Sequence, residues 1–266
     1  MFARFPRLQE VHYEPWREWD EGFQMLTDRD YLYLFESIHR LNTDLKSVVI
    51  FENFNQQYPA IIQRYLRRGG MTGCDSLRKP APAVGRSVAL ASLNLEHLAA
   101  SYIADASHFF EIEASWRWLN LSSLVLTSIL LTPNEDPTKI GAMLQAAAAA
   151  AMKMPQLDTM EIWNGRKGLA SLFKYQAFRK TQQATITWRA TWTLTMKPAV
   201  IQAWEAVILM YDGWRLDVVQ ERLDGAAINS HGDAIEYLML SGQIIRPISL
   251  HQILMEQRAM EDMETV

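Results

Sequence analysis

Five short segments of the chain share one hydrophobic pattern, and this recurrence constrains the fold more than any other feature. Each has the form L-x-x-L-x-L with tolerant apolar identity, and a weaker sixth copy, "ATITW", contains Ile186 and Trp188. Alternating apolar positions in short runs are typical of β-strands. The pattern therefore predicts at least five similar strands. The five segments begin at Leu8 ("LQEVHY"), Leu45 ("LKSVVI"), Leu90 ("LASLNL"), Leu121 ("LSSLVL") and Leu157 ("LDTMEI").

Apolar residues at helical spacing follow the first four segments, within residues 31–41, 58–66, 98–109 and 135–155. The last of these has Asp136 as a helix cap and Pro137 in the first turn, and it stops at Pro155. Strand followed by helix, repeated four times, predicts an α/β fold. We expect an irregular leucine-rich-repeat-like solenoid, with a parallel sheet and helices on its outer face. The intervals exceed the roughly 20–29 residues of ordinary leucine-rich repeats.

The repeats divide the chain into two predicted parts. Residues 1–177 carry the strand–helix repeats, interrupted by a loop at 67–85 that is rich in glycine, proline and charge. Residues 178–266 contain further strand-like and helical segments. We interpret these as degenerate repeats and helices that close the C-terminal end of the solenoid.

Composition excludes several classes of protein. The 266 residues carry a formal net charge of −4, which disfavours nucleic-acid binding because phosphates attract basic surfaces. The single cysteine, Cys74, allows no internal disulfide, and the N-terminus lacks the apolar core of a signal peptide. No apolar run is long enough to span a bilayer. We expect an intracellular protein, in cytoplasm or nucleus, that does not bind membranes.

No catalytic motif stands out, so the sequence favours a role without catalysis, cofactor or metal. The chain has no phosphate-binding loop, nucleophile elbow or H-E-x-x-H zinc motif. Cys74 lacks an adjacent base, and the His108, Glu111 and Glu113 cluster offers at most half a metal site. Glu14 and Asp20 are more typical of an acidic loop than of an acid–base pair. An α/β enzyme with a site at the carboxyl ends of parallel strands stays open as the alternative.

If the segments stack as strands, the residues between the apolar positions face the open, concave side of the sheet. We predict that this face binds a protein partner. Its residues form three rows: Glu10, Ser47, Ser92, Ser123 and Thr159; then His12, Val49, Asn94, Val125 and Glu161; then Glu14, Phe51, Glu96, Thr127 and Trp163. An aspartate at Leu124, on the helix side, should disrupt the core, whereas one at Thr127 should be tolerated. Coverage of this face by the chain's own C-terminal segment remains an alternative.

The segments "FPRLQEVHYEPWREW", "LKSVVIFENFN", "LSSLVLTSILL" and "MPQLDTMEIWNG" resemble the leucine-rich-repeat-like region of fungal F-box-associated proteins of unknown function. The resemblance implies a solenoid that presents a surface to a protein, which in F-box receptors is a substrate for ubiquitination. Two features depart from the family. The helical F-box expected before the first repeat is absent, and only Asn53 occupies the repeat's asparagine position. The predicted function is a non-enzymatic interaction module, with a part of an F-box-type ubiquitin ligase receptor as its narrower form. The partner's identity and the oligomeric state do not follow from the sequence.

Overall fold

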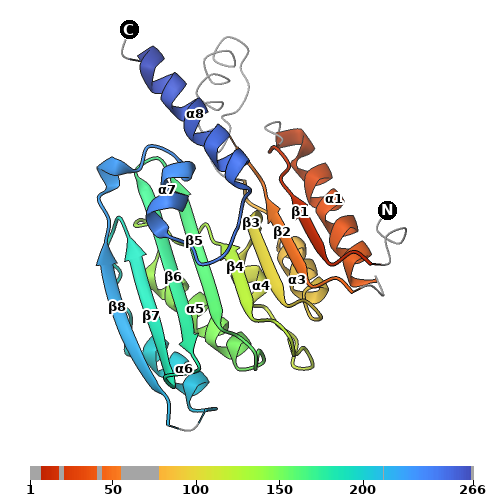
Figure 1. Ribbon diagram of the computed structural model, residues 1–266, viewed down its shortest axis with the longest axis vertical. Coiled ribbons are helices and arrows are strands. Elements are labelled where there is room, and N and C mark those ends of the chain that lie inside the picture. The colour runs from red at the N-terminus through yellow and green to blue at the C-terminus, as the bar shows by residue number, and fades with distance from the viewer. Residues whose placement is uncertain (1–6, 18–20, 41–43, 55–77, 212, 265–266) are drawn as a thin grey trace.

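The chain forms an open eight-stranded sheet whose strands lie side by side in sequence order (Figure 1). The computed structural model describes residues 7–17, 21–40, 44–54, 78–211 and 213–264. Strands β1 to β5 are parallel, β6 is antiparallel to both β5 and β7, and β8 is parallel to β7. The predicted α/β class is therefore confirmed. The strands are β1 (Glu10–Tyr13), β2 (Ser47–Phe51), β3 (His97–Asp105), β4 (Ser123–Thr127), β5 (Thr159–Arg166), β6 (Leu169–Phe178), β7 (Gln183–Ala190) and β8 (Arg215–Arg222).

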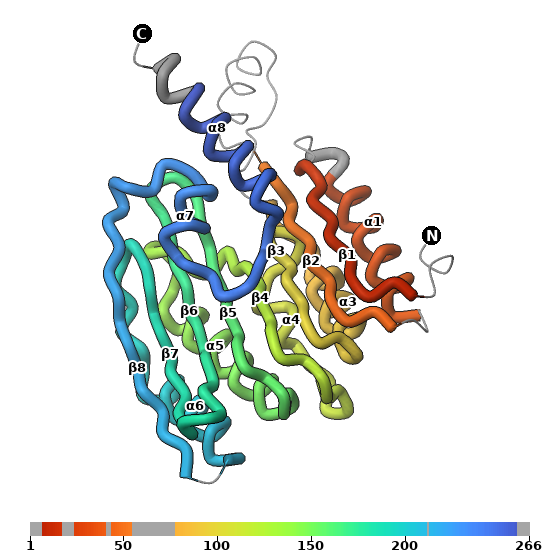
Figure 2. Tube along the Cα trace, in the orientation of Figure 1, coloured from red at the N-terminus to blue at the C-terminus, as the bar shows by residue number. Residues whose placement is uncertain are grey.

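Helices cover both faces of the sheet, not one. The main core packs one strand face against five helices: α1 (Glu21–His39), α3 (Pro82–Ala91), α4 (Ala106–Phe109), α5 (Pro137–Ala151) and α6 (Pro198–Ile208). On the opposite face lie α7 (His231–Leu238) and α8 (Pro247–Glu264), joined to β8 by a short 3-10 turn, η2 (Gly225–Ala227). Figure 2 shows the C-terminal segment crossing in front of the strands. The expectation that the last helices close the end of a solenoid is wrong for α7 and α8.

The helix predicted between the Asp136 cap and Pro155 is confirmed as α5, which ends at Ala151. The Asp136 side chain accepts a hydrogen bond from the Thr138 amide at 2.7 Å, and Pro137 occupies the first turn. Its apolar side chains, such as Ile140 and Leu144, are buried against the sheet. Capping and an apolar stripe together make this element predictable from sequence.

The third predicted strand, Leu90–Leu95, is wrong. Leu90 lies in α3, and residues 92–94 form the turn that ends this helix. The L-x-x-L spacing also fits a helix, whose apolar side chains recur every three or four residues. The loop predicted at 67–85 is wrong over its last four residues, because Pro82 begins α3 as a first-turn proline. Gly85 is required there, since a Cβ atom would lie 2.7 Å from the Cβ of His108.

The true third strand is β3, which takes up most of the helix predicted at 98–109. Only residues 106–109 of that prediction are helical, as α4. Eight of its nine residues are buried, so it shows no polar alternation that would mark a strand. Its register shifts between Ala100 and Asp105, and Tyr102 has a positive φ of 65°. The main-chain amide of Tyr102 donates to Thr127 Oγ1 at 2.7 Å, which holds this irregularity in place.

The parallel order ends at β5. The "ATITW" copy does lie in a strand, β7. However, β6 lies between β5 and β7 and runs antiparallel to both. The L-x-x-L-x-L pattern does not include β6, so a strictly parallel sheet is wrong for this half. The helix predicted at 58–66, most of the loop at 67–85 and Cys74 lie outside the described residues.

Candidate functional site

The predicted partner-binding residues fall mainly on the sheet face opposite the main helix layer. The parallel register places Glu10, Ser47, Ser123 and Thr159 in one row, with His97 of β3 between Ser47 and Ser123. The next row consists of His12, Val49, Ala99, Val125 and Glu161. The inward and outward alternation predicted for β1, β2, β4 and β5 therefore holds in these two rows.

The three residues predicted for the third strand do not lie on this face. Ser92 is buried at the end of α3, where its hydroxyl donates to the Ala89 carbonyl and accepts from Trp118 Nε1, both at 2.8 Å. Asn94 is exposed in the turn, and Glu96 forms a 2.8 Å ion pair with Lys46. These placements are wrong because "LASLNL" is a helix end and not a strand.

The upper part of the face is not open. Phe51, Thr127 and Trp163 are buried, together with Phe54 and Tyr102, and we call this region the covered half. The aromatic rings contact one another: the Tyr102 ring centroid lies 5.5 Å from Phe51 and 5.1 Å from Trp163. Apolar side chains of the C-terminal segment complete this second core: Ile235, Leu238, Ile244 and Ile253. The predicted exposed role of Phe51, Thr127 and Trp163 is therefore wrong.

A glycine allows the C-terminal segment to approach this closely. A Cβ atom on Gly165 of β5 would lie 2.4 Å from the Cβ of Ala234 in α7. No other residue fits between this strand and this helix without displacing one of them. The tyrosine hydroxyl of Tyr102 donates to the Gly165 carbonyl at 2.9 Å, so strand, helix and aromatic cluster meet at one point.

Hydrogen bonds also hold the C-terminal segment against the sheet at two glutamates. Both Glu161 carboxylate oxygens accept from the Ser241 amide, at 2.9 and 3.1 Å, and Lys174 lies 3.5 Å away. Glu14 accepts from the Arg246 amide at 2.8 Å and also from the Ser249 hydroxyl. Glu161 and Glu14, predicted to face a partner, are therefore occupied by the chain's own C-terminal segment.

His231 begins α7 and joins it to the sheet. Its imidazole stacks on Phe54 at 4.3 Å, and Nε2 lies 3.2 Å from Asn53 Oδ1. Burial lowers the pKa of His231 to about 3, so the ring is neutral in the folded protein at neutral pH. Asn53, the single asparagine at its repeat position, thus contacts the C-terminal segment.

The lower part of the face remains open as a pocket of about 210 Å³, which we call the trough. Six of the predicted residues line it, and they come from three strands. Sequence reasoning missed His97, Leu98 and Ala99, because β3 was misplaced, and Gly242 and Gln243, for which the sequence gives no signal. The six predicted lining residues are Glu10, His12, Ser47, Val49, Ser123 and Val125.

The trough combines an apolar floor with a polar wall. Val49, Ala99 and Val125 supply the floor, and the Glu10 carboxylate lies 2.7 Å from His12 Nε2 on the wall. The hydrogen bond with His12 lowers the pKa of Glu10, with a smaller contribution from Ser47, so this carboxylate is charged at neutral pH. His12 Nδ1 is buried without a hydrogen-bond partner among the described atoms. This arrangement suits recognition of a side chain with apolar and polar parts.

The carboxyl ends of the parallel strands carry a separate polar cluster. Arg78 Nε donates to Glu52 at 2.9 Å, and Arg78 also pairs with Asp28. Burial alone would lower the pKa of Arg78, but the neighbouring carboxylates raise it above its ordinary value. Tyr31 donates to the second Glu52 oxygen at 2.8 Å. These groups satisfy one another, as expected for a buried ionic network that connects α1, β2 and the start of α3.

Asp105, at the end of β3, is similarly occupied. Its carboxylate accepts from the amides of Ser107 and Ile129, at 2.9 and 2.7 Å. The cavity between Arg78, Asp105 and Asn164 measures about 10 Å³, roughly the space of one water molecule.

The candidate metal residues form a surface ion-pair cluster. His108 Nδ1 lies 2.8 Å from Glu111, which also pairs with Arg86 at 3.0 Å, and Glu113 is exposed. Nowhere in the described residues do three or more His, Cys, Asp or Glu side chains come together to hold a metal ion. None of the described helices has the length and apolar character needed to cross a membrane.

One family model, described as a family of unknown function (DUF6546), matches residues 40–246. The chain belongs to this family. The DUF6546 match includes β2 through α7 and leaves β1, α1 and α8 outside. No curated protein and no solved structure shows significant similarity to the chain. The family description mentions neither an F-box nor leucine-rich repeats, so that narrower resemblance stays a prediction.

Proposed function

We propose that this DUF6546 protein is a non-enzymatic interaction module into whose trough a partner protein inserts side chains. The observation that carries the proposal is the convergence of Glu10, His12, Ser47, Val49, Ser123 and Val125 on one open pocket. The covered half of the same sheet face is packed under the C-terminal segment. Shaped pockets with an apolar floor and a few fixed polar groups are typical of recognition sites.

The parallel half of the sheet supports the comparison with solenoid binding proteins. In β1 to β5, each parallel strand is backed by the helix layer and turns its other face away from those helices. The narrower form of the proposal is an irregular leucine-rich-repeat-like receptor that recognises a substrate for an F-box-type ubiquitin ligase. It rests on the sequence resemblance alone. In either form the protein acts inside the cell, in cytoplasm or nucleus.

The test is affinity capture from the native cell, with mass spectrometry, using the full chain and two variants. Ser47→Arg places a long side chain across the trough. Asn94→Arg introduces the same charge in the exposed turn after α3 and is the matched control. We expect a partner that the wild type and Asn94→Arg retain and that Ser47→Arg loses.

Two outcomes separate the forms of the proposal. Equal capture by all three proteins, or by none, would contradict a partner site in the trough. Ubiquitin-ligase adaptors recovered with the wild type would support the narrower receptor form, and their absence beside a trough-dependent partner would leave only the broader one.

A further inference from the structure

Within the described residues, the edge of the sheet at β1 is open for another strand. Among the described strands, β1 has one neighbour, β2. The Gln9 carbonyl accepts from the amides of Lys46 and Ser47, and the Pro15 carbonyl accepts from Asn53. Odd-numbered residues therefore direct their main-chain groups toward β2. By alternation, Glu10, His12 and Glu14 direct theirs toward the open edge, where they form a template for strand pairing.

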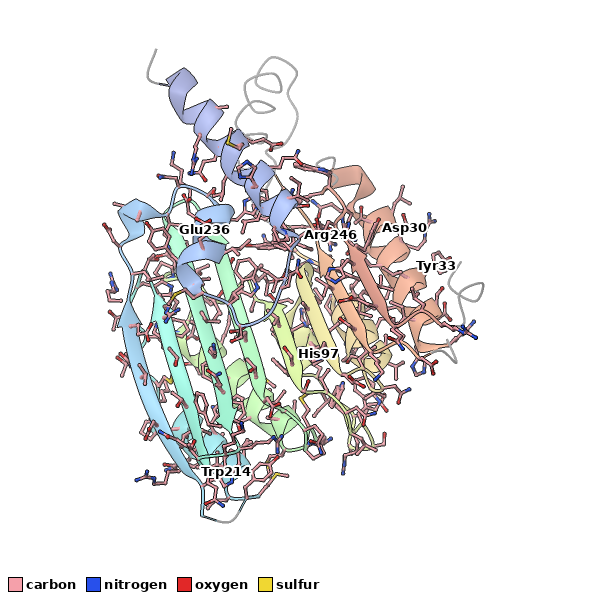
Figure 3. The ribbon with its side chains drawn as sticks, in the orientation of Figure 1. Asp30, Tyr33, His97, Trp214, Glu236 and Arg246 are labelled. Atoms are coloured by element: carbon pink, nitrogen blue, oxygen red, sulfur yellow. The ribbon has the colours of Figure 1, made fainter. Side chains whose placement is uncertain are left out.

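A groove of about 650 Å³ lies beside this edge, between β1 and α1. Aromatic side chains dominate its rim, and they are unusually exposed: Tyr13 by 47%, Trp16 by 52% and Tyr33 by 59%. Val11 and Leu34 extend the apolar lining inward. Figure 3 shows Tyr33 and Asp30 on α1 at the outer side of the molecule. Exposed aromatic residues around a hollow are typical of protein-binding surfaces.

The groove also has a charge preference. Asp30 is the one carboxylate among the described residues that line it, and no lysine or arginine is among them. A basic side chain would complement this carboxylate. A second copy of this chain would offer β1 itself, Glu10–Tyr13, which carries an acid and no lysine or arginine. The negative charge of Asp30 therefore favours a segment of a different protein, rather than a second copy of this chain, as the occupant of the groove.

We propose that β1 is a docking edge for an extended segment of a partner protein. The segment pairs with the outward main-chain groups of β1, places apolar side chains in the groove, and sets a lysine or arginine beside Asp30. Main-chain bonds supply affinity and the groove supplies specificity, as in other cases of strand addition. The groove and the trough lie on opposite sides of β1, because Val11 and Tyr13 face the groove while Glu10 faces the trough. His12 lines both.

The experiment selects peptides from a phage-displayed library of random linear peptides on the full chain, and measures their affinity by fluorescence anisotropy. We expect selected peptides to alternate apolar residues and to carry a basic residue. His12→Pro removes an outward amide that the added strand needs, and it should weaken these peptides by about tenfold or more. His12→Ala keeps that amide and removes only a side chain that lines the groove, so it should weaken the peptides less than His12→Pro does.

A second variant keeps the test decisive if the proline prevents folding, as judged by circular dichroism. Asp30→Lys changes an exposed helix residue and should weaken basic peptides by about tenfold, whereas Ser47→Arg, in the trough, should leave them bound. Failure to select any peptide, or wild-type affinity for the selected peptides in both His12→Pro and Asp30→Lys, would overturn the proposal. A wild-type dimer that His12→Pro converts to monomer in sedimentation would assign the edge to a second copy instead. Asp30 lines the groove and not the trough, so the outcome with Asp30→Lys does not bear on partner capture through the trough.

Discussion

The covered half and the trough belong to the same face of the same strands, yet one is core and the other is open. Residues four positions apart on β2 make the contrast clear, since Ser47 lines the trough and Phe51 is buried under the C-terminal segment. On β4, Ser123 and Thr127 differ in the same way. The alternation along a strand decides on which face of the sheet a side chain lies. Whether that side chain is exposed to solvent depends on its size and on whether the C-terminal segment covers it. Four experiments test this contrast.

The largest effect should come from charges placed on either side of β4 in its buried part. Leu124→Asp puts a carboxylate into the main core, and Thr127→Asp puts one into the covered half. Each should lower the free energy of unfolding by about 4 kcal/mol or more, or prevent folding, because an unpaired buried charge is costly. Urea denaturation of the two variants measures this. Tolerance of Thr127→Asp would mean that the C-terminal segment does not cover this part of the sheet.

Removal of the largest aromatic side chain in the covered half should rank next. Trp163 is fully buried between Tyr102 and the C-terminal segment. Trp163→Ala should cost about 3–5 kcal/mol, since it leaves a large cavity. Thermal unfolding followed by circular dichroism checks this, with Trp16→Ala, at an exposed position outside the covered half, as the control expected to change little. Equal losses would contradict the contrast between the two positions.

Acid should loosen the covered half through His231. Burial lowers the pKa of His231 from 6.5 to about 3 in the folded protein. Between these two pH values the unfolded chain therefore binds a proton on His231 that the folded protein does not. The contribution is fully present above pH 6.5 and is lost as pH falls, by up to about 3 kcal/mol near pH 4. Stability measured against pH should depend less on acid in His231→Phe, which keeps the stacking on Phe54. An unchanged pH dependence would exclude His231 as its source.

The smallest effect should come from the trough. Ser123→Asp introduces the same carboxylate as Thr127→Asp, but four residues earlier on β4 and on the same face, where the pocket is open. The free energy of unfolding should change by less than about 0.5 kcal/mol, because the charge remains hydrated. The same urea titration serves as the measurement. A loss comparable to that of Thr127→Asp would show that the trough is closed in solution.

The elements that sequence predicted well are those with an unambiguous local signal. Helix α5 carries its own cap and proline, and β2, β4 and β5 alternate apolar and small polar residues over a few positions. Strand β3 failed because both of its faces are buried, so its sequence is apolar throughout and fits a helix as well. Strand β6 was missed because the repeat pattern does not include it.

The candidate site divides in the same way. The placement of Glu10, Ser47 and Ser123 in one row follows from strand period and parallel register, which the repeats determine. The presence of His97 in this row could be predicted only with the correct position of β3. Gln243 also lines the trough, although it lies more than a hundred residues from the strand residues in the sequence.

The sequence by itself determined the α/β class, the direction of the first strands and the side of the sheet on which their residues lie, because these follow from local periodicity. Tertiary structure alone decided that α7 and α8 return across that side. The physical reason lies in contacts that no local pattern encodes: Ala234 against Gly165, Ser241 on Glu161 and His231 on Phe54. These contacts bury the aromatic row and leave the small polar row as the trough.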